Sequence, residues 1–333
     1  AGVLDIKTTI LPDADALFLT AIDRYGHELW RWTFPVNKLN QANEVLSPLS
    51  NKVTSTETEN ELTVKAKNHT FIFSKKDGQL KGVSVNNRKI SFANGPRFIG
   101  ARRADRSLDQ FYNHDDEKAK EKDRTYSEFP DAAVFTKLDV KEDGGNLVVT
   151  ANYKLGNLDK AQWTINPSGE LALDYTYNCS GVVDLMGIRF DYPEDQVISK
   201  RWLGAGPYRV WQNRIHGTQY DVWENDYNDP IPGETFTYPE FKGYFGDVSW
   251  MNIQTKEGTI SLTNETPDAY IGVYQPRDGR DRLLYTLPES GISVLNVIPP
   301  VRNKVNSTDL CGPSSQPKWV NGPQTGRVIF RFM

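Results

Sequence analysis

The chain has 333 residues, of which 38% are hydrophobic, 25% charged and 11% aromatic, and its formal net charge is −4 at pH 7. This length suits one large domain or two, with enough apolar material for a sizeable core. The negative charge gives no indication of a nucleic-acid-binding protein, and no run of about 18 apolar residues predicts a membrane span. Cys179 and Cys311 are too few for a disulfide framework or a zinc site; two buried thiols are expected, with a disulfide as the alternative.

Residues 1–45 have the pattern of a small β unit. Ala16 to Thr20 is apolar, a turn sequence comes next, and every second residue in the later part of Glu28 to Phe34 is aromatic. This alternation predicts a β-hairpin. Because two or three strands cannot bury a core alone, the hairpin should either pack on the next unit of the chain or be the tail of a domain that begins upstream.

Residues 37–58 are polar and predict a linker, and the second unit is expected to span 46–333. Its clearest strand is 171–179, where period-two alternation places the side chains of Leu171, Leu173, Tyr175, Tyr177 and Cys179 on one face. Further strands are expected at 62–66, 71–73, 80–85, 147–155, 250–255, 259–264, 270–274, 293–298 and 327–332. Many short strands separated by turns predict an all-β fold, a large antiparallel β-sandwich.

The densely charged segment 105–128 predicts a solvated loop or a short exposed helix, with a Ca²⁺ site formed by its carboxylates as the alternative. The four histidines are scattered without metal-ligand spacing, so neither a metal nor a cofactor is expected. Glycoside hydrolysis uses two carboxylates, but the sequence does not single out a pair among Glu224, Asp226, Asp229, Glu234 and Glu240.

The stretch Arg201 to Arg214 combines a predicted turn with arginines and aromatic residues. A strand is expected to end at Trp202–Leu203, and Gly204, Gly206 and Pro207 then predict a sharp bend. Flat apolar rings and forked guanidinium donors beside a rigid turn suit the recognition of a sugar. A structural bend with packed aromatic side chains is the alternative interpretation.

Read with five other stretches, this turn resembles the C-terminal domain of family 2 β-galactosidases, often called the β-galactosidase small chain. The matches occur in the family's order over residues 60–333. They comprise the entry segment Gly95 to Arg106, the strand pair around Trp163 to Gly169, the Gly-x-Gly-Pro motif at Gly204 to Pro207 with Asn213-Arg214, the elements Pro239 to Gly243 and Asp247 to Trp250, and the late loop Cys311 to Trp319.

The resemblance implies a supersandwich of the galactose-mutarotase type, preceded by the tail of an immunoglobulin-like domain at residues 1–45. It also implies an accessory role: the domain contacts carbohydrate and completes the active site of a separate catalytic barrel. Its partners would then be that barrel and a galactoside-like glycan, and no catalytic residue is expected in this chain. A periplasmic or extracellular location is expected.

The residues expected to contact carbohydrate are Trp319, which matches the family's late-loop tryptophan, and also Arg209, Arg214, His216, Glu240 and Trp250. Trp319 is expected at the surface, with an inward-packed anchor as the alternative. The chain departs from the family at Arg209, where a glutamate is usual, so the substrate preference of lactose-type enzymes is not carried over. Two other functions stay open: a pure binding module, and a free-standing mutarotase-like epimerase that uses Glu240 and His216 as opposed acid and base.

Overall fold

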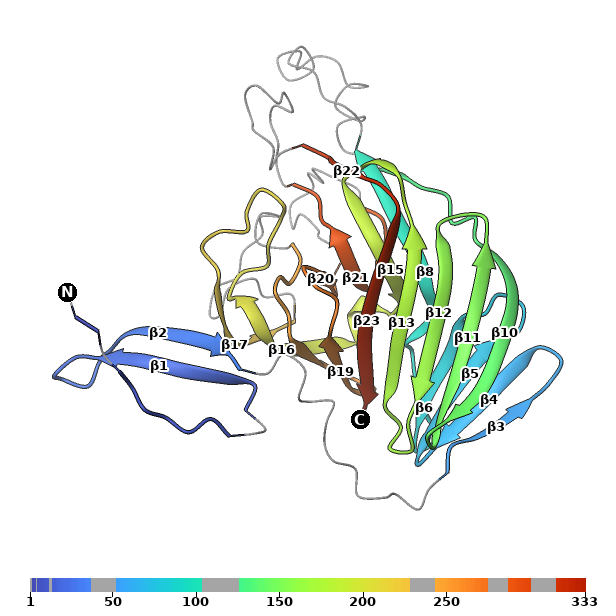
Figure 1. Cartoon of the computed structure of the whole chain (residues 1–333), viewed down its shortest axis with the longest axis horizontal. Helices are drawn as coiled ribbons and strands as arrows, with labels where there is room; N and C mark the ends of the chain where they lie inside the picture. The colour runs from blue at the N-terminus through green and yellow to red at the C-terminus, as the bar shows by residue number, and fades with distance from the viewer. Residues whose placement is uncertain are drawn as a thin grey trace, which may run out of the picture. The chain divides into compact units, whose positions relative to one another are not determined.

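The computed structural model describes residues 2–3, 5–11, 14–36, 52–103, 126–227, 243–274, 287–300 and 316–333 (Figure 1). The chain divides into two structural units, Ala1–Pro48 and Leu49–Met333. In the described residues every pairing between strands is antiparallel, and no helix is long and apolar enough to cross a membrane.

The first unit contains the predicted hairpin, formed by β1 (Ala16–Ile22) and β2 (Glu28–Pro35). Its turn is closed by the Asp23 carboxylate, which accepts hydrogen bonds from the backbone N–H groups of Tyr25 and His27 at 2.8 and 2.9 Å. The aromatic side chains of β2 remain about half exposed, with Trp30 at 48% and Trp32 at 43%. The assignment of this unit to an immunoglobulin-like domain stays a prediction.

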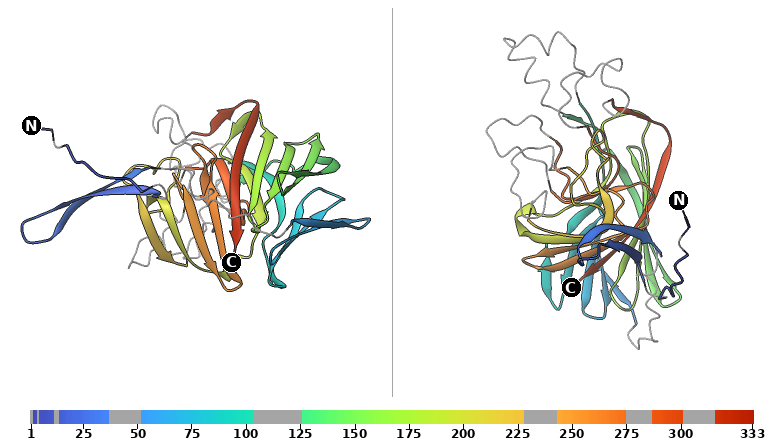
Figure 2. Two further views of the ribbon diagram at one scale, coloured as in Figure 1. Left: turned by 60° about the horizontal axis from the view of Figure 1, so that its bottom comes forward. Right: turned by 90° about the vertical axis from the view of Figure 1, so that its left-hand side faces the viewer.

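The second unit is built on two large sheets that face each other (Figures 1 and 2). The first sheet has nine strands in the order β10 (Val134–Asp143), β11 (Asn146–Lys154), β12 (Leu158–Ile165), β13 (Leu171–Asn178), β23 (Pro323–Phe332), β19 (Gly258–Asn264), β18 (Trp250–Thr255), β16 (Val197–Gly206) and β17 (Gln219–Asp226). A single 3-10 turn, Glu194–Gln196, is the helical element among the described residues.

The second sheet has ten strands. Its path runs through β20 (Tyr270–Gly272), β21 (Ile292–Val297), β15 (Leu185–Asp191), β8 (Ala93–Arg103), β6 (Leu80–Val85), β5 (His69–Ser74), β4 (Glu61–Ala66) and β3 (Thr54–Glu57), with β7 (Arg88–Ile90) paired to β6 and β9 (Tyr126–Glu128) paired to β8. A separate two-stranded ladder joins β14 (Gly181–Val183) to β22 (Lys318–Val320).

The core lies between the two large sheets, where side chains of alternate residues meet. On β13 the predicted inward face is fully buried: Leu171, Leu173, Tyr175 and Tyr177 are each at most 2% exposed. Phe190 of the second sheet meets Trp163 and Phe330 of the first edge to face, with ring centroids 5.9 and 5.4 Å apart. The predicted all-β fold, a large antiparallel sandwich, is therefore confirmed.

The predicted end of the strand at Leu203 is wrong, because β16 continues to Gly206 and pairs with β17 up to Gln219. The absence of side chains at Gly204 and Gly206 allows neighbouring residues to pack closely against β16, and it does not serve a bend in the chain. A Cβ atom on Gly206 would lie 2.6 Å from Cγ of the Trp223 ring, and one on Gly204 would lie 3.0 Å from the Gly246 carbonyl oxygen. The chain turns only after these residues, at Pro207.

Candidate functional site

The segment after β16 is anchored to the sandwich by backbone pairing. Val210 and Tyr244 exchange two N–H···O hydrogen bonds of 2.7 and 2.8 Å, and the Arg214 N–H donates to the Trp211 carbonyl at 2.8 Å. The rings of Trp211 and Tyr244 are both 1% exposed and meet edge to face at 5.6 Å. The buried packing ends at Gln212, and residues 213–218 are partly or fully exposed.

Gln212 connects this turn to the segment that leads to Trp319. Its side-chain Nε2 donates to the Gln316 carbonyl oxygen at 2.8 Å, and its backbone N–H donates to the Pro299 carbonyl oxygen at 3.0 Å. Three stretches that are far apart in the sequence therefore meet at one place. We call this surface, formed by residues 212–218 and 316–320, the rim.

Trp319 lies on the rim and is held there by backbone pairing. It is the middle residue of β22, opposite Val182 of β14, and its side chain is 75% exposed. The next residue, Val320, packs against the core, so successive side chains point to opposite sides, as in any strand. Of the two expected placements, the structure shows the surface residue and not the inward anchor.

Arg214 and His216 also lie exposed on the rim. Their turn is closed by Thr218, whose hydroxyl donates to the Ile215 carbonyl oxygen at 3.1 Å, and by Gly217 at φ +95°, a conformation that glycine adopts at little cost. Three of the six predicted contact residues are therefore exposed, two on the turn and one on β22, and the Gln212–Gln316 hydrogen bond joins these two segments.

Arg209 and Trp250, two further predicted contact residues, are covered in this structure. Arg209 is 2% exposed, and its guanidinium carbon lies 5.1 Å from the centroid of the Tyr274 ring. Trp250 is 8% exposed, with the Arg201 guanidinium carbon 5.7 Å from its ring centroid. Cation–π contacts of this kind give each side chain a structural role. A role in contacting a ligand stays a prediction and requires their covering residues to move.

Glu240 lies outside the described residues, as do Cys311, most of the late loop and residues 105–125 of the charged segment. The last three residues of that segment, Tyr126–Glu128, form strand β9 instead of loop. Cys179 is a buried thiol whose pKa is raised by burial. Among the described residues no group of three or more His, Cys, Asp or Glu side chains is placed to hold a metal ion.

Gln212 is a rim residue that the sequence did not single out, although it joins the two segments of the rim. It is 8% exposed, and its partner Gln316 is 104 residues further along the chain. An isolated glutamine between two aromatic-rich motifs carries no local pattern, so no signal in the sequence could have identified the contact.

Several solved structures are similar to this chain at low identity. Galactose 1-epimerase from Lactobacillus acidophilus NCFM is 10% identical and has a TM-score of 0.43, with 85% of this chain and 99% of that chain covered. An aldose epimerase homologue from C. elegans is 8% identical, with a TM-score of 0.35 and coverage of 84% and 99%. A galactose mutarotase-like protein from Lactobacillus casei ATCC 334 is 11% identical, with a TM-score of 0.33 and coverage of 84% and 100%.

No curated protein sequence matches the chain. The model of one family, described as beta galactosidase small chain, matches residues 65–299. This range contains the Gly-x-Gly-Pro motif, the turn that carries Arg214 and His216, and most strands of both large sheets. The resemblance seen in the sequence is thereby confirmed: the chain belongs to the beta galactosidase small chain family.

Proposed function

We propose that this chain is an accessory domain of a family 2 β-galactosidase-like glycoside hydrolase. It contacts carbohydrate at the rim and completes the active site of a separate catalytic barrel. The observation that carries this proposal is the exposed indole of Trp319, which is 75% exposed although its backbone is held in a strand pair. Family membership supports the connection to a β-galactosidase.

An exposed tryptophan on a fixed backbone is suited to stacking on the C–H face of a pyranose. Burying about 100 Å² of its ring at roughly 25 cal/mol per Å² would contribute about 2.5 kcal/mol. Arg214 supplies a planar group of N–H donors for hydroxyl oxygens, and His216 adds a second polar group on the same turn. Since the second wall of the site would come from the barrel, binding by this chain alone should be weak, near a Kd of about 1 mM.

The binding part of the proposal is tested by ligand-observed NMR titration of methyl β-D-galactopyranoside against the wild-type chain and Trp319→Ala. We expect Trp319→Ala to remove the rim's contribution to binding. Trp30→Ala is a matched control, because Trp30 is also an exposed tryptophan, 48% accessible, but lies on the hairpin of the first unit. Unchanged binding in Trp319→Ala, or an equal loss in Trp30→Ala, would refute a carbohydrate role for the rim.

The accessory part is tested by two activity assays on the purified chain. We expect no hydrolysis of an aryl β-galactoside, because the proposal places the acid and the nucleophile on the barrel. The competing hypothesis, a mutarotase-like epimerase with Glu240 and His216 as acid and base, is tested by polarimetry of freshly dissolved α-D-galactose. Catalysed mutarotation that is lost in both Glu240→Gln and His216→Ala would replace the accessory role by the epimerase.

A further inference from the structure

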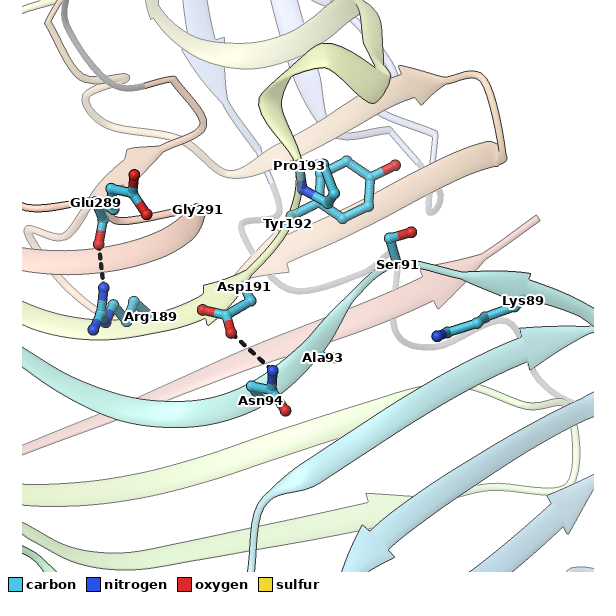
Figure 3. A pocket seen from close by; sticks show the side chains of 10 residues that line it. All are labelled: Lys89, Ser91, Ala93, Asn94, Arg189, Asp191, Tyr192, Pro193, Glu289 and Gly291. Atoms are coloured by element: carbon cyan, nitrogen blue, oxygen red, sulfur yellow. Dashed lines mark hydrogen bonds between the residues drawn. The ribbon is translucent and has the colours of Figure 1, made fainter.

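A cavity of about 350 Å³ lies at the other end of β8 from the rim. It is lined by residues at the start of β8 and the end of β15 and by the segment Glu289–Gly291 (Figure 3). The β14–β22 ladder lies near the far end of β8, where the Asp184 N–H donates to the Ala101 carbonyl oxygen. Eight residues of strand separate Asn94 from Arg102, which corresponds to about 26 Å at 3.3 Å per residue, so the cavity and the rim are separate.

The walls of the cavity are fixed by hydrogen bonds between side chains. The Asp191 carboxylate accepts from Asn94 Nδ2 at 2.8 Å and forms an ion pair with Arg97. Tyr192 donates its hydroxyl to the Glu257 carboxylate at 3.2 Å, and Ser91 donates to the same carboxylate at 2.6 Å from its hydroxyl. A polar site with fixed walls spends little free energy on ordering side chains when a ligand binds.

Two charged groups of the lining, Lys89 and Glu289, retain hydrogen-bonding capacity, whereas Arg189 belongs to the wall. Arg189 donates from Nη1 to the Glu289 carbonyl oxygen, while its Nε is buried and has no hydrogen-bond partner among the described residues. Among the described residues, neither the Lys89 ammonium nor the Glu289 carboxylate forms an ion pair. The cavity therefore offers unused donors from Lys89 and an unused acceptor from Glu289.

The balance of these charges decides the class of ligand. The lining carries two cations, Lys89 and Arg189, and two carboxylates, Asp191 and Glu289, so its formal charges cancel. A phosphate or an amine would meet both attraction and repulsion in such a lining, so neither gains a net electrostatic advantage to offset the loss of its hydration. A neutral polyhydroxylated ring can accept from Lys89 and donate to Glu289 at the same time. Tyr192 and Pro193 add an apolar wall of the kind that faces the C–H groups of a pyranose.

We propose that this cavity binds one neutral pyranose unit of a saccharide and is a second carbohydrate site, distinct from the rim. Its volume of about 350 Å³ lies at the lower end of the range of small-molecule sites, roughly 300–1,000 Å³, which suits a single ring. The adjoining recess of about 210 Å³ shares Tyr192, Pro193 and Glu289 with it and leaves room for a substituent on that ring.

The test uses the full 333-residue chain carrying Trp319→Ala, so that rim binding does not contribute. Methyl β-D-galactopyranoside and methyl β-D-glucopyranoside are titrated by ligand-observed NMR, with inorganic phosphate and putrescine as charged probes. On this background the double variant Lys89→Met, Glu289→Gln should raise the Kd for the sugar at least fivefold. The matched control Lys65→Met, Glu59→Gln changes the same residue types at exposed positions, one on β4 and one in the turn before it, and should leave the Kd unchanged.

Absence of sugar binding on the Trp319→Ala background would overturn the second site, and so would an unchanged Kd in the Lys89→Met, Glu289→Gln variant. Stronger binding of phosphate or putrescine than of either glycoside would also overturn it, since the cavity would then select charge. Circular dichroism of the test variant and of the control variant checks that their substitutions leave the fold intact. Because the rim is tested separately with Trp319 present, failure of one carbohydrate site does not imply failure of the other.

Discussion

Trp319 and Trp163 show that the loss of folding stability on replacing a tryptophan depends on whether its side chain is exposed or buried. Trp163 is fully buried on β12 and packs against Phe73 and Phe190, whereas Trp319 is 75% exposed on β22. The same indole therefore contributes mainly to folding stability in one place and remains available to a ligand in the other. Stability and binding measurements on the two variants separate these contributions.

Trp319→Ala should change the free energy of unfolding by less than about 1 kcal/mol, because exposed side chains away from special features contribute little. Trp163→Ala, the buried control, should lower it by about 3–5 kcal/mol. Urea denaturation followed by circular dichroism measures both. A loss above about 2 kcal/mol in Trp319→Ala would mean that this indole is part of the packing that holds β14 and β22 together.

Gly206→Ala should destabilise the protein by about 1–3 kcal/mol, since an added methyl group in a filled space forces its neighbours to move. Its Cβ atom would lie 2.6 Å from Cγ of Trp223. Gly82→Ala is the matched control, because that glycine also lies in a strand but its added Cβ would have no atom closer than 3.8 Å. Thermal melting of both variants tests the prediction, and equal melting temperatures would contradict it.

At the scale of elements, the rim is held together by a few hydrogen bonds that link the turn after β16 to the segment before β22, and β22 to β14. Neither large sheet joins these segments by strand pairing. The β14–β22 ladder is three residues long on each side, and a side-chain bond from Gln212 ties the segment before it to the turn after β16. Short ladders of this kind open more readily than the central strands of a sheet. The orientation of Trp319 should therefore be sensitive to Gln212.

Gln212→Ala removes the bond to the Gln316 carbonyl and should cost about 0.5–1.5 kcal/mol of stability. The amide hydrogens of Lys318–Val320 should exchange faster in this variant, while those of β12 and β13 stay protected. Gln254→Ala, at an exposed position of β18, is the control for a change of the same residue type. If exchange in Lys318–Val320 is unaltered, the Gln212 bond does not hold β22 in place.

The sequence predicts elements well where a pattern is local. The alternation over 171–179 identifies β13 and its buried face, and β18 begins and ends at the predicted residues, Trp250 and Thr255. It fails where a neighbour far along the chain decides the outcome. Gly206 is required by Trp223 of the adjacent strand, and Arg209 is covered by Tyr274, 65 residues later. The sequence also identifies Trp319 as a surface residue, but it does not show Gln212 as its support.

At the scale of the whole molecule, buried phenols make the fold sensitive to alkaline pH. Burial raises the pKa of Tyr175 to about 12, and burial raises the pKa values of Tyr153, Tyr177 and Tyr244 as well. In the unfolded chain a tyrosine ionises near its ordinary pKa of about 10. The folded-state pKa is therefore the higher one, so the stability associated with these neutral phenols is full below pH 10 and is lost as the pH rises toward 12.

We expect tyrosinate absorbance to rise together with loss of the β circular-dichroism signal, in one cooperative step between about pH 10 and 12. Tyr175→Phe removes one group that ionises preferentially in the unfolded state, so its transition should move to higher pH. Both signals are recorded in the same titration. Ionisation of the buried tyrosines while the β signal persists would show that their pKa values are not raised by folding.

The position of β23 also affects how the protein is made. β23 lies between β13 and β19 in the nine-stranded sheet, and in that sheet it alone bridges the group β10 to β13 and the group β16 to β19. A ribosome releases this strand after every other strand of the sheet. Until then each group has an open edge of unpaired N–H and C=O groups, and such edges are where nascent chains aggregate. A nonsense mutation at the codon for Pro323 would therefore yield two unjoined half-sheets, a substrate for chaperones and proteases, instead of a protein that merely lacks one strand.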